Sequence, residues 1–209
     1  MPDDAYWQLM AQQRHDLATF LEDLTPQQWD APSLCSAWRV RDVAAHLALT
    51  PQVSRGRMFR AALRAGGNPH RVAAETAIRH ASRPTEEILR EIHEHAERRD
   101  LPWPLDGRNV LFDLLVHTQD MLRPLGVDRP MPTEAARMAL DRVWEIGWPF
   151  RARRRLHGVG LRATDTDWTA GDGPEVAGRT EDLLLLATGR TEAATERLSG
   201  PGVGALVSR

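Results

Sequence analysis

Apolar residues recur at helical spacing through residues 1–150 of the chain. They fall three or four positions apart over residues 6–24, and Pro26 predicts the end of that helix. The same spacing predicts a second helix over residues 40–65, which the glycines, asparagine and proline of residues 66–69 would end. The first part of the chain is therefore predicted to consist of helices separated by proline-marked breaks.

Three further helices are predicted before residue 150. Pro84, followed by two glutamates, opens the first of them, and it ends before Pro102. The next two cover residues 108–125 and 133–148. Long helices joined by loops of moderate length are typical of an up-and-down four-helix bundle, so the pattern predicts a mainly α fold.

The pattern changes in the last quarter of the chain. Residues 157–179 hold five of the 15 glycines and short alternating apolar runs, which predict two or three short strands. Residues 180–187 and 191–197 then have the pattern of short helices. We therefore expect a helical bundle domain over residues 1–155 and a small α/β C-terminal domain over residues 156–209.

The composition excludes several kinds of chemistry and partner. All 27 basic residues are arginine, so no lysine amine is present to form a Schiff base. With 29 acidic residues the net charge is −2, which gives no excess positive charge for nucleic acid. The single cysteine, Cys35, excludes an intrachain disulfide. No signal pattern and no long apolar run is present, so we expect a cytoplasmic protein without membrane contact.

The predicted helix over residues 108–125 carries the candidate chemistry. It is apolar around most of its circumference, which is typical of a buried helix. Asp113, His117 and Asp120 fall together in one narrow polar stripe of that helix. Residues four apart point to the same side of a helix, so Asp113 and His117 are predicted to reach one point. A carboxylate and an imidazole buried together indicate either an ion pair or metal ligands.

The predicted helix over residues 40–65 offers a third ligand, His46. It lies next to the apolar face formed by neighbouring valines and leucines, where a histidine is also compatible with a purely structural role. Two imidazoles and a carboxylate, with one position left open, suit a catalytic Zn²⁺, and Ni²⁺, Mn²⁺ or Fe²⁺ would also be accepted. Asp120 would then orient the His117 imidazole or act as a base, and its alternative is a salt bridge with Arg123.

Other reactive side chains have weaker support. His93 and His95 are two residues apart on a predicted helix, so they point apart and are expected at the surface. Cys35 has no neighbouring base in the sequence, and a free cysteine without one is typically buried and inert. The arginine-rich run 151–155 is typical of a solvated helix end, with anion binding as the alternative.

Three segments together resemble the mycothiol-dependent maleylpyruvate isomerase family, the actinobacterial branch of the DinB-like superfamily. Residues 34–47 resemble its Cys–Trp–Val–Arg–Asp–Val…Ala–His–Leu block, and residues 113–126 resemble its second metal block. Residues 171–190 resemble its small C-terminal domain. The resemblance implies a DinB-like bundle whose divalent metal is bound by residues equivalent to His46, Asp113 and His117.

The resemblance also implies a chemistry. Mycothiol, a low-molecular-weight thiol, would bind the metal as a thiolate and add to a small-molecule electrophile, as an isomerase or an S-transferase does. A C-terminal arginine supports catalysis in the isomerase, and Arg190 is its match here. The family has glutamate where this chain has Asp113, which is one methylene shorter and so would ligate directly, through water or weakly.

Two alternatives and one assembly state stay open at this point. A DinB-like bundle without catalytic activity would serve as a ligand-binding or regulatory module. A DNA-acting role has only the name of the superfamily in its favour, and the charge argues against it. Bundles of this size often pair, so a homodimer is open as well.

Overall fold

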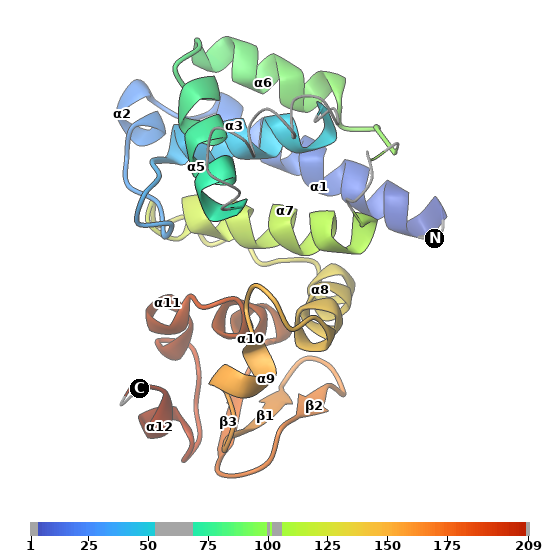
Figure 1. The fold of residues 1–209 in the computed structure, drawn as a ribbon, viewed down its shortest axis with the longest axis vertical. Helices are drawn as coiled ribbons and strands as arrows, with labels where there is room; N and C mark the ends of the chain where they lie inside the picture. Colours follow the sequence, from blue (N-terminus) through green and yellow to red (C-terminus); the bar gives the residue numbers. More distant parts are fainter. Residues whose placement is uncertain (1–3, 53–68, 100, 102–105, 208–209) are drawn as a thin grey trace. The chain divides into compact units, whose positions relative to one another are not determined.

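The computed structural model describes residues 4–52, 69–99, 101 and 106–207 (Figure 1). These residues form two compact units. The first comprises Met1–Val110 with His117–Asp128, and the second comprises Leu111–Val116 with Arg129–Arg209. Each unit consists of two segments of the chain, whereas the predicted domain boundary is a single cut after residue 155. That boundary stays a prediction.

The first unit is helical throughout its described residues. Its longer helices are α1 (Asp4–Glu22), α3 (Val40–Leu49), α5 (Pro69–His80) and α6 (Thr85–Glu94), with α2 (Pro26–Trp29) and the 3₁₀ turn η1 (Thr50–Gln52) between them. Helix α7 (Gly107–Leu122) belongs to it at both ends, whereas the middle of that helix, Leu111–Val116, is grouped with the second unit. Helix α6 packs against both α1 and α3, and α5 packs against α3 (Figure 1). This is the helical bundle that the apolar spacing predicted.

Helix α3 begins with a strong local cap. The backbone N–H of Arg39 donates to Oδ2 of Asp42 at 2.9 Å, and the Arg39 guanidinium donates to the same carboxylate. Asp42 is buried at 3% exposure, so its charge is compensated inside the bundle. The cap fixes the start of the helix, and its carboxylate residue, Asp42, lies about one turn before His46.

Two predicted helix boundaries need correction. Helix α3 ends at Leu49 and passes into η1, because Pro51 has no N–H to donate to the carbonyl of Leu47. The rest of the helix predicted over residues 40–65 lies largely outside the described residues. Helix α7 ends at Leu122, where the backbone N–H of Val127 returns to the Leu122 carbonyl and Gly126 adopts a φ of 69°. No pattern had predicted α5.

The second unit combines helices with a small sheet. Its elements are α8 (Thr133–Glu145), α9 (Ala152–Arg155), β1 (Gly160–Ala163), β2 (Thr169–Ala170), β3 (Glu175–Gly178), α10 (Thr180–Ala187), α11 (Thr191–Thr195) and α12 (Val203–Val207). Strand β1 lies in the middle, antiparallel to β2 and parallel to β3 (Figure 1). The predicted fold class, mainly α with a small α/β part, is confirmed.

Helix α10 forms the core of the second unit. Every residue from Thr180 to Ala187 is buried, and the helix packs against α8 and α11. Asp165 accepts hydrogen bonds from the Thr180 backbone N–H at 2.8 Å and from its hydroxyl at 2.7 Å, so it caps the start of α10. The apolar run that predicted this helix is thus wholly used in packing. None of the helices in the described ranges has the length and hydropathy of a membrane-spanning segment.

Candidate metal centre

Helix α7 presents the polar stripe that the sequence predicted. Its apolar residues Leu114, Leu115 and Val116 are buried, as a core helix requires. Between and beyond them, Asp113 and His117 are half-buried, and Asp120 is completely buried. A helix with this much apolar surface holds such groups only where each has a polar or charged partner.

Helix α3 supplies the second imidazole. The ring of His46 lies against the ring of His117, with their centroids 5.0 Å apart and their planes at 77°. Trp38, just before α3, contacts both rings, at 5.2 Å from His46 and 5.6 Å from His117. Three aromatic rings from two segments of the chain therefore meet at one place.

The three predicted ligands lie together. His46, Asp113 and His117 each offer a ligand atom, and these atoms all lie within 4.8 Å of one another. The shorter Asp113 side chain still brings its oxygen into this group.

The donor atoms of these residues fit a divalent metal. Two nitrogen donors and one oxygen donor form a set that zinc and other first-row divalent ions accept. Beside the histidines, Trp38 Nε1 is buried and has no hydrogen-bond partner among the described residues. This N–H needs an acceptor, so it would bond a water or a bound molecule at the site and not the ion itself. The donor set therefore supports a metal centre.

Asp120 contacts the Nδ1 nitrogen of the His117 ring. Its Oδ2 lies 2.8 Å from His117 Nδ1, in a pair where the carboxylate is 0% and the imidazole 13% exposed. An ionised carboxylate only accepts, so His117 Nδ1 carries the proton of this hydrogen bond. The contact agrees with the orienting role predicted for Asp120, since it makes Nε2 the ring nitrogen suited to bind a metal.

Cys35 also reaches this place, which the sequence analysis missed. Its Sγ lies 3.1 Å from Asp120 Oδ2 and 3.6 Å from His117 Nδ1. The sequence predicted a buried and isolated cysteine, whereas Cys35 is only partly buried and lies beside a carboxylate and an imidazole. The contact joins residues 82 and 85 positions apart, so no local pattern could show it. The only available signal was that Cys35 lies in a segment carrying the family resemblance.

Other predicted residues lie elsewhere. His93 bonds Glu22 at 2.8 Å on an exposed part of the first unit, as its surface prediction requires. Arg190 belongs to the second unit, precedes α11 and donates to the Thr188 carbonyl at 3.0 Å. Its catalytic role stays a prediction.

The arginine-rich run 151–155 is less solvated than predicted. Arg155 donates to the carbonyls of Phe150, Leu186 and Ala187, and burial lowers the pKa of its guanidinium. Leu186 and Ala187 are the last residues of α10, so the cation caps the negative end of that helix. For Arg155 the prediction of a solvated helix end is wrong.

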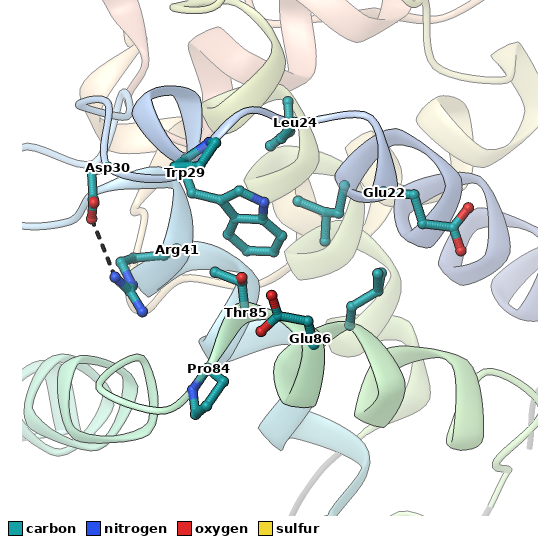
Figure 2. A pocket seen from close by; sticks show the side chains of 11 residues that line it. Glu22, Leu24, Trp29, Asp30, Arg41, Pro84, Thr85 and Glu86 are labelled. Carbon is teal, nitrogen blue, oxygen red and sulfur yellow. Dashed lines mark hydrogen bonds and ion pairs between the residues drawn. The ribbon is translucent and has the colours of Figure 1, made fainter.

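The first unit also has an open pocket of about 410 Å³ (Figure 2). Trp29, Leu21 and Leu24 form its apolar wall, and Arg41 at its rim pairs with Asp30 at 3.4 Å. The residues lining it include neither histidine nor cysteine. The pocket thus lacks the donor set assembled around His117, and the histidine group is the stronger candidate for catalysis.

Comparison with known proteins shows a family match over part of the chain and a shared fold over most of it. Residues 10–105 match the family described as the mycothiol maleylpyruvate isomerase N-terminal domain. A crystal structure of a histidine-to-alanine mutant of the mycothiol-dependent maleylpyruvate isomerase aligns with a TM-score of 0.62 at 13% identity, covering 96% of this chain and 93% of that chain. Another crystal structure of that isomerase aligns with a TM-score of 0.57 at 12% identity, with the same coverage. No curated protein matches.

The family match contains residues 34–47, the first of the three segments that carry the resemblance, and so confirms it for that part of the chain. The structural alignments, at 13% and 12% identity, show a shared fold over nearly the whole chain.

Proposed function

From the match of residues 10–105 to the N-terminal domain of mycothiol maleylpyruvate isomerase, we propose that this protein is a metal-dependent enzyme that uses mycothiol. Its reaction is the addition of the thiol to an electrophilic small molecule, in an isomerisation or a transfer. The observation that carries this proposal is the group formed by His46, Asp113 and His117, whose ligand atoms lie within 4.8 Å of one another.

The proposed metal is Zn²⁺, bound by these three side chains. Three protein ligands leave a fourth position open, which is typical of catalytic rather than structural zinc. A divalent ion bound there would lower the pKa of an incoming thiol and favour its thiolate at neutral pH.

The remaining steps of the proposal involve the chain's own residues. Asp120 holds His117 by the 2.8 Å hydrogen bond and so keeps one nitrogen directed at the metal. Arg190 is the proposed partner for a substrate carboxylate, since a guanidinium forms two parallel hydrogen bonds with a carboxylate. The chain has no lysine to take this role.

The bond changes balance without an oxidant or reductant. The thiolate forms a carbon–sulfur bond with the electrophile, and the electron pair of the substrate's double bond moves to the adjoining carbonyl oxygen as an enolate, which leaves a single bond. After rotation about that bond, the enolate pair re-forms the double bond and expels the thiolate, which gives the isomer and regenerates the thiolate. In a transfer, a leaving group departs in place of the thiolate.

Metal binding is the first test. Zn²⁺ is titrated into the purified, metal-free protein by calorimetry, beside the His46→Ala/His117→Ala double variant and a His93→Ala/His15→Ala control whose histidines pair with surface glutamates. We expect one ion to bind the wild type and the control, and none to bind the double variant at that site. Equal uptake by all three proteins would refute the centre.

Thiol consumption is the second test. Mycothiol and an electrophile, such as maleylpyruvate or a halogenated arene, are incubated with the zinc-loaded and the chelator-treated protein. Loss of thiol or formation of isomer only with the loaded protein supports an enzyme. Tight zinc binding without either product would support a ligand-binding bundle that has lost its catalytic activity.

A further inference from the structure

We propose that Cys35 is a positioning residue of this centre, acting on His117 through Asp120. Its thiol and the His117 Nδ1–H donate to the same carboxylate oxygen, and this relay holds the imidazole in the tautomer and orientation that present Nε2 to the metal. The inference deepens the proposed function and rests on its metal centre.

The distances define the relay. Cys35 Sγ lies 3.1 Å and His117 Nδ1 lies 2.8 Å from Oδ2 of Asp120, and the two donors are themselves 3.6 Å apart. Both donors therefore converge on one oxygen. A thiol is a weak donor, but a bond to an ionised acceptor is about twice as strong as a neutral one.

Burial explains why a second donor matters. Asp120 is 0% exposed, and the two apolar residues that follow it on α7, Met121 and Leu122, are buried as well. A carboxylate in such a place is costly unless several donors compensate its charge. Removing the thiol would remove one of these donors. The Asp120 oxygen that accepts from His117 would then be held less firmly in position.

The loop around Cys35 is itself held in place. The Leu34 N–H donates to the backbone carbonyl of Asp120 at 3.0 Å, which ties the loop to α7. The Cys35 N–H donates to Ser33 Oγ at 3.1 Å, and that hydroxyl donates to the Trp38 carbonyl at 2.8 Å. The thiol therefore meets Asp120 from a preorganised backbone, as a positioning role requires.

The arrangement argues against Cys35 as a nucleophile. In a cysteine–histidine–carboxylate triad, nucleophile and carboxylate bond opposite ring nitrogens of the histidine. Here both Cys35 and Asp120 face Nδ1, the nitrogen that has to carry a proton in order to donate to an ionised Asp120 carboxylate. His117 thus has no basic nitrogen directed at the thiol.

A direct metal ligand is the competing role, because Cys35, His117 and Asp120 also form a group of ligand atoms within 4.8 Å of one another. An ion in that group would displace the Nδ1 proton and break both hydrogen bonds to Asp120. It would also compete for His117 with His46 and Asp113. The satisfied hydrogen bonds favour the relay, and cobalt spectroscopy separates the two roles.

The test compares Co²⁺ and Zn²⁺ affinities of the full-length protein with those of Cys35→Ala, Cys35→Ser and Asp120→Asn. We expect Cys35→Ala to weaken binding by about tenfold, at the lower end of the effect known for residues that support metal ligands. Asp120→Asn should weaken it more, because it removes the shared acceptor. Cys35→Ser, which keeps a hydroxyl donor, should restore most of the affinity.

Two further readouts exclude a merely structural effect. Nitrogen-15 NMR of the metal-free protein should show His117 protonated at Nδ1 in the wild type and in Cys35→Ser, and a mixture of tautomers in Cys35→Ala. Ser33→Ala, which loosens the same loop but keeps the thiol, is the matched control and should retain more affinity than Cys35→Ala.

Several results would overturn the relay. A thiolate-to-cobalt charge-transfer band that is present in the wild type and disappears in Cys35→Ser would make Cys35 a metal ligand. Loss of metal affinity in Cys35→Ser, together with such a band in the wild type, would lead to the same conclusion. Unchanged affinity and tautomer in Cys35→Ala, or an equal loss in Ser33→Ala, would also refute it. If the wild type binds neither ion, the proposed function is wrong. The NMR measurement on the metal-free protein still tests whether Cys35 fixes the tautomer of His117.

Discussion

At the scale of single residues, His117 connects both groups of candidate ligands. It belongs to the group with His46 and Asp113 and to the group with Cys35 and Asp120. Its pairing with Asp113 follows from a spacing of four along a helix, so the sequence could predict it. Its contact with Cys35 depends on how a loop folds back onto α7, which no spacing encodes.

Trp38 allows a direct optical test of the centre. Because its ring lies 5.2 Å and 5.6 Å from the rings of His46 and His117, an ion such as Co²⁺ bound there should quench its fluorescence. We expect Trp38→Phe to lose most of the quenching seen in the wild type. Trp144→Phe, which changes a tryptophan paired with Trp168 in the second unit, is the control and should keep it.

At the scale of elements, Arg14 of α1 holds the end of α6. Its Nη1 donates to the carbonyls of His95, Ala96 and Arg98 at 3.3, 3.0 and 2.9 Å. The side chain is buried at 6% exposure, and this burial lowers the pKa of its guanidinium. Helix ends leave carbonyls unsatisfied, and here a cation from another helix bonds those just beyond α6.

The three hydrogen bonds of Arg14 form a clamp on the end of α6, and removing this clamp should destabilise the first unit. We expect Arg14→Met to lower the free energy of unfolding by about 2–3 kcal/mol, since it leaves buried carbonyls without a donor. Arg90→Met is the matched control, because Arg90 is exposed and pairs with Glu94 of the same helix at 3.7 Å. It should cost less than about 0.5 kcal/mol. Urea denaturation followed by circular dichroism measures both, and equal losses would contradict the clamp.

Glu91 of α6 makes the junction with α5 sensitive to pH. Burial alone would raise the pKa of its carboxyl, but hydrogen bonds from Arg83 and His80 outweigh this and hold the pKa below its ordinary value of 4.5. A carboxyl with a lowered pKa stabilises the folded state above its unfolded pKa, and the contribution is lost as pH falls through the folded pKa.

Glu91→Gln should therefore reduce the free energy of unfolding at pH 7. The difference from the wild type should shrink as the pH falls below about 4.5, where the wild-type carboxyl becomes protonated. Denaturation at several pH values measures it, with the exposed Glu94→Gln as control. A difference that stays constant down to pH 3 would show that the carboxylate charge contributes nothing.

Element boundaries were predictable where a local signal marks them. Glutamates after Pro84 predicted the start of α6, and the apolar run of residues 183–187 predicted α10. Helix α3 ends early because Pro51 has no N–H to donate. The apolar spacing continues on both sides of Pro51, so the sequence pattern did not show this end. Helix α5 was not predicted, because Pro69 follows two glycines and an asparagine and so marks the end of a helix as well as the first turn of the next one.

At the scale of the whole molecule, the two units divide the helices in a way the sequence did not predict. The change in composition near residue 156 placed α8 with the bundle, whereas the contacts group residues from Arg129 onward with the second unit, where α8 packs against α10. Composition reports the local pattern, and packing between segments distant in sequence decides which residues unfold together.

Hydrogen exchange with and without Zn²⁺ tests both this division and the metal centre. At a free concentration 100 times the Kd, an ion that binds only the folded state adds about 2.7 kcal/mol of stability. Because His46 and His117 belong to the first unit, we expect protection to rise most in α3 and α7 and much less in β1–β3.

The response of α8 tests the division into units. If the units unfold separately, the protection of α8 should change as that of the sheet does, whereas the predicted boundary after residue 155 requires it to change as that of α3 does. An equal rise everywhere would mean that the chain unfolds as one cooperative block, and no rise in the bundle would contradict the metal centre.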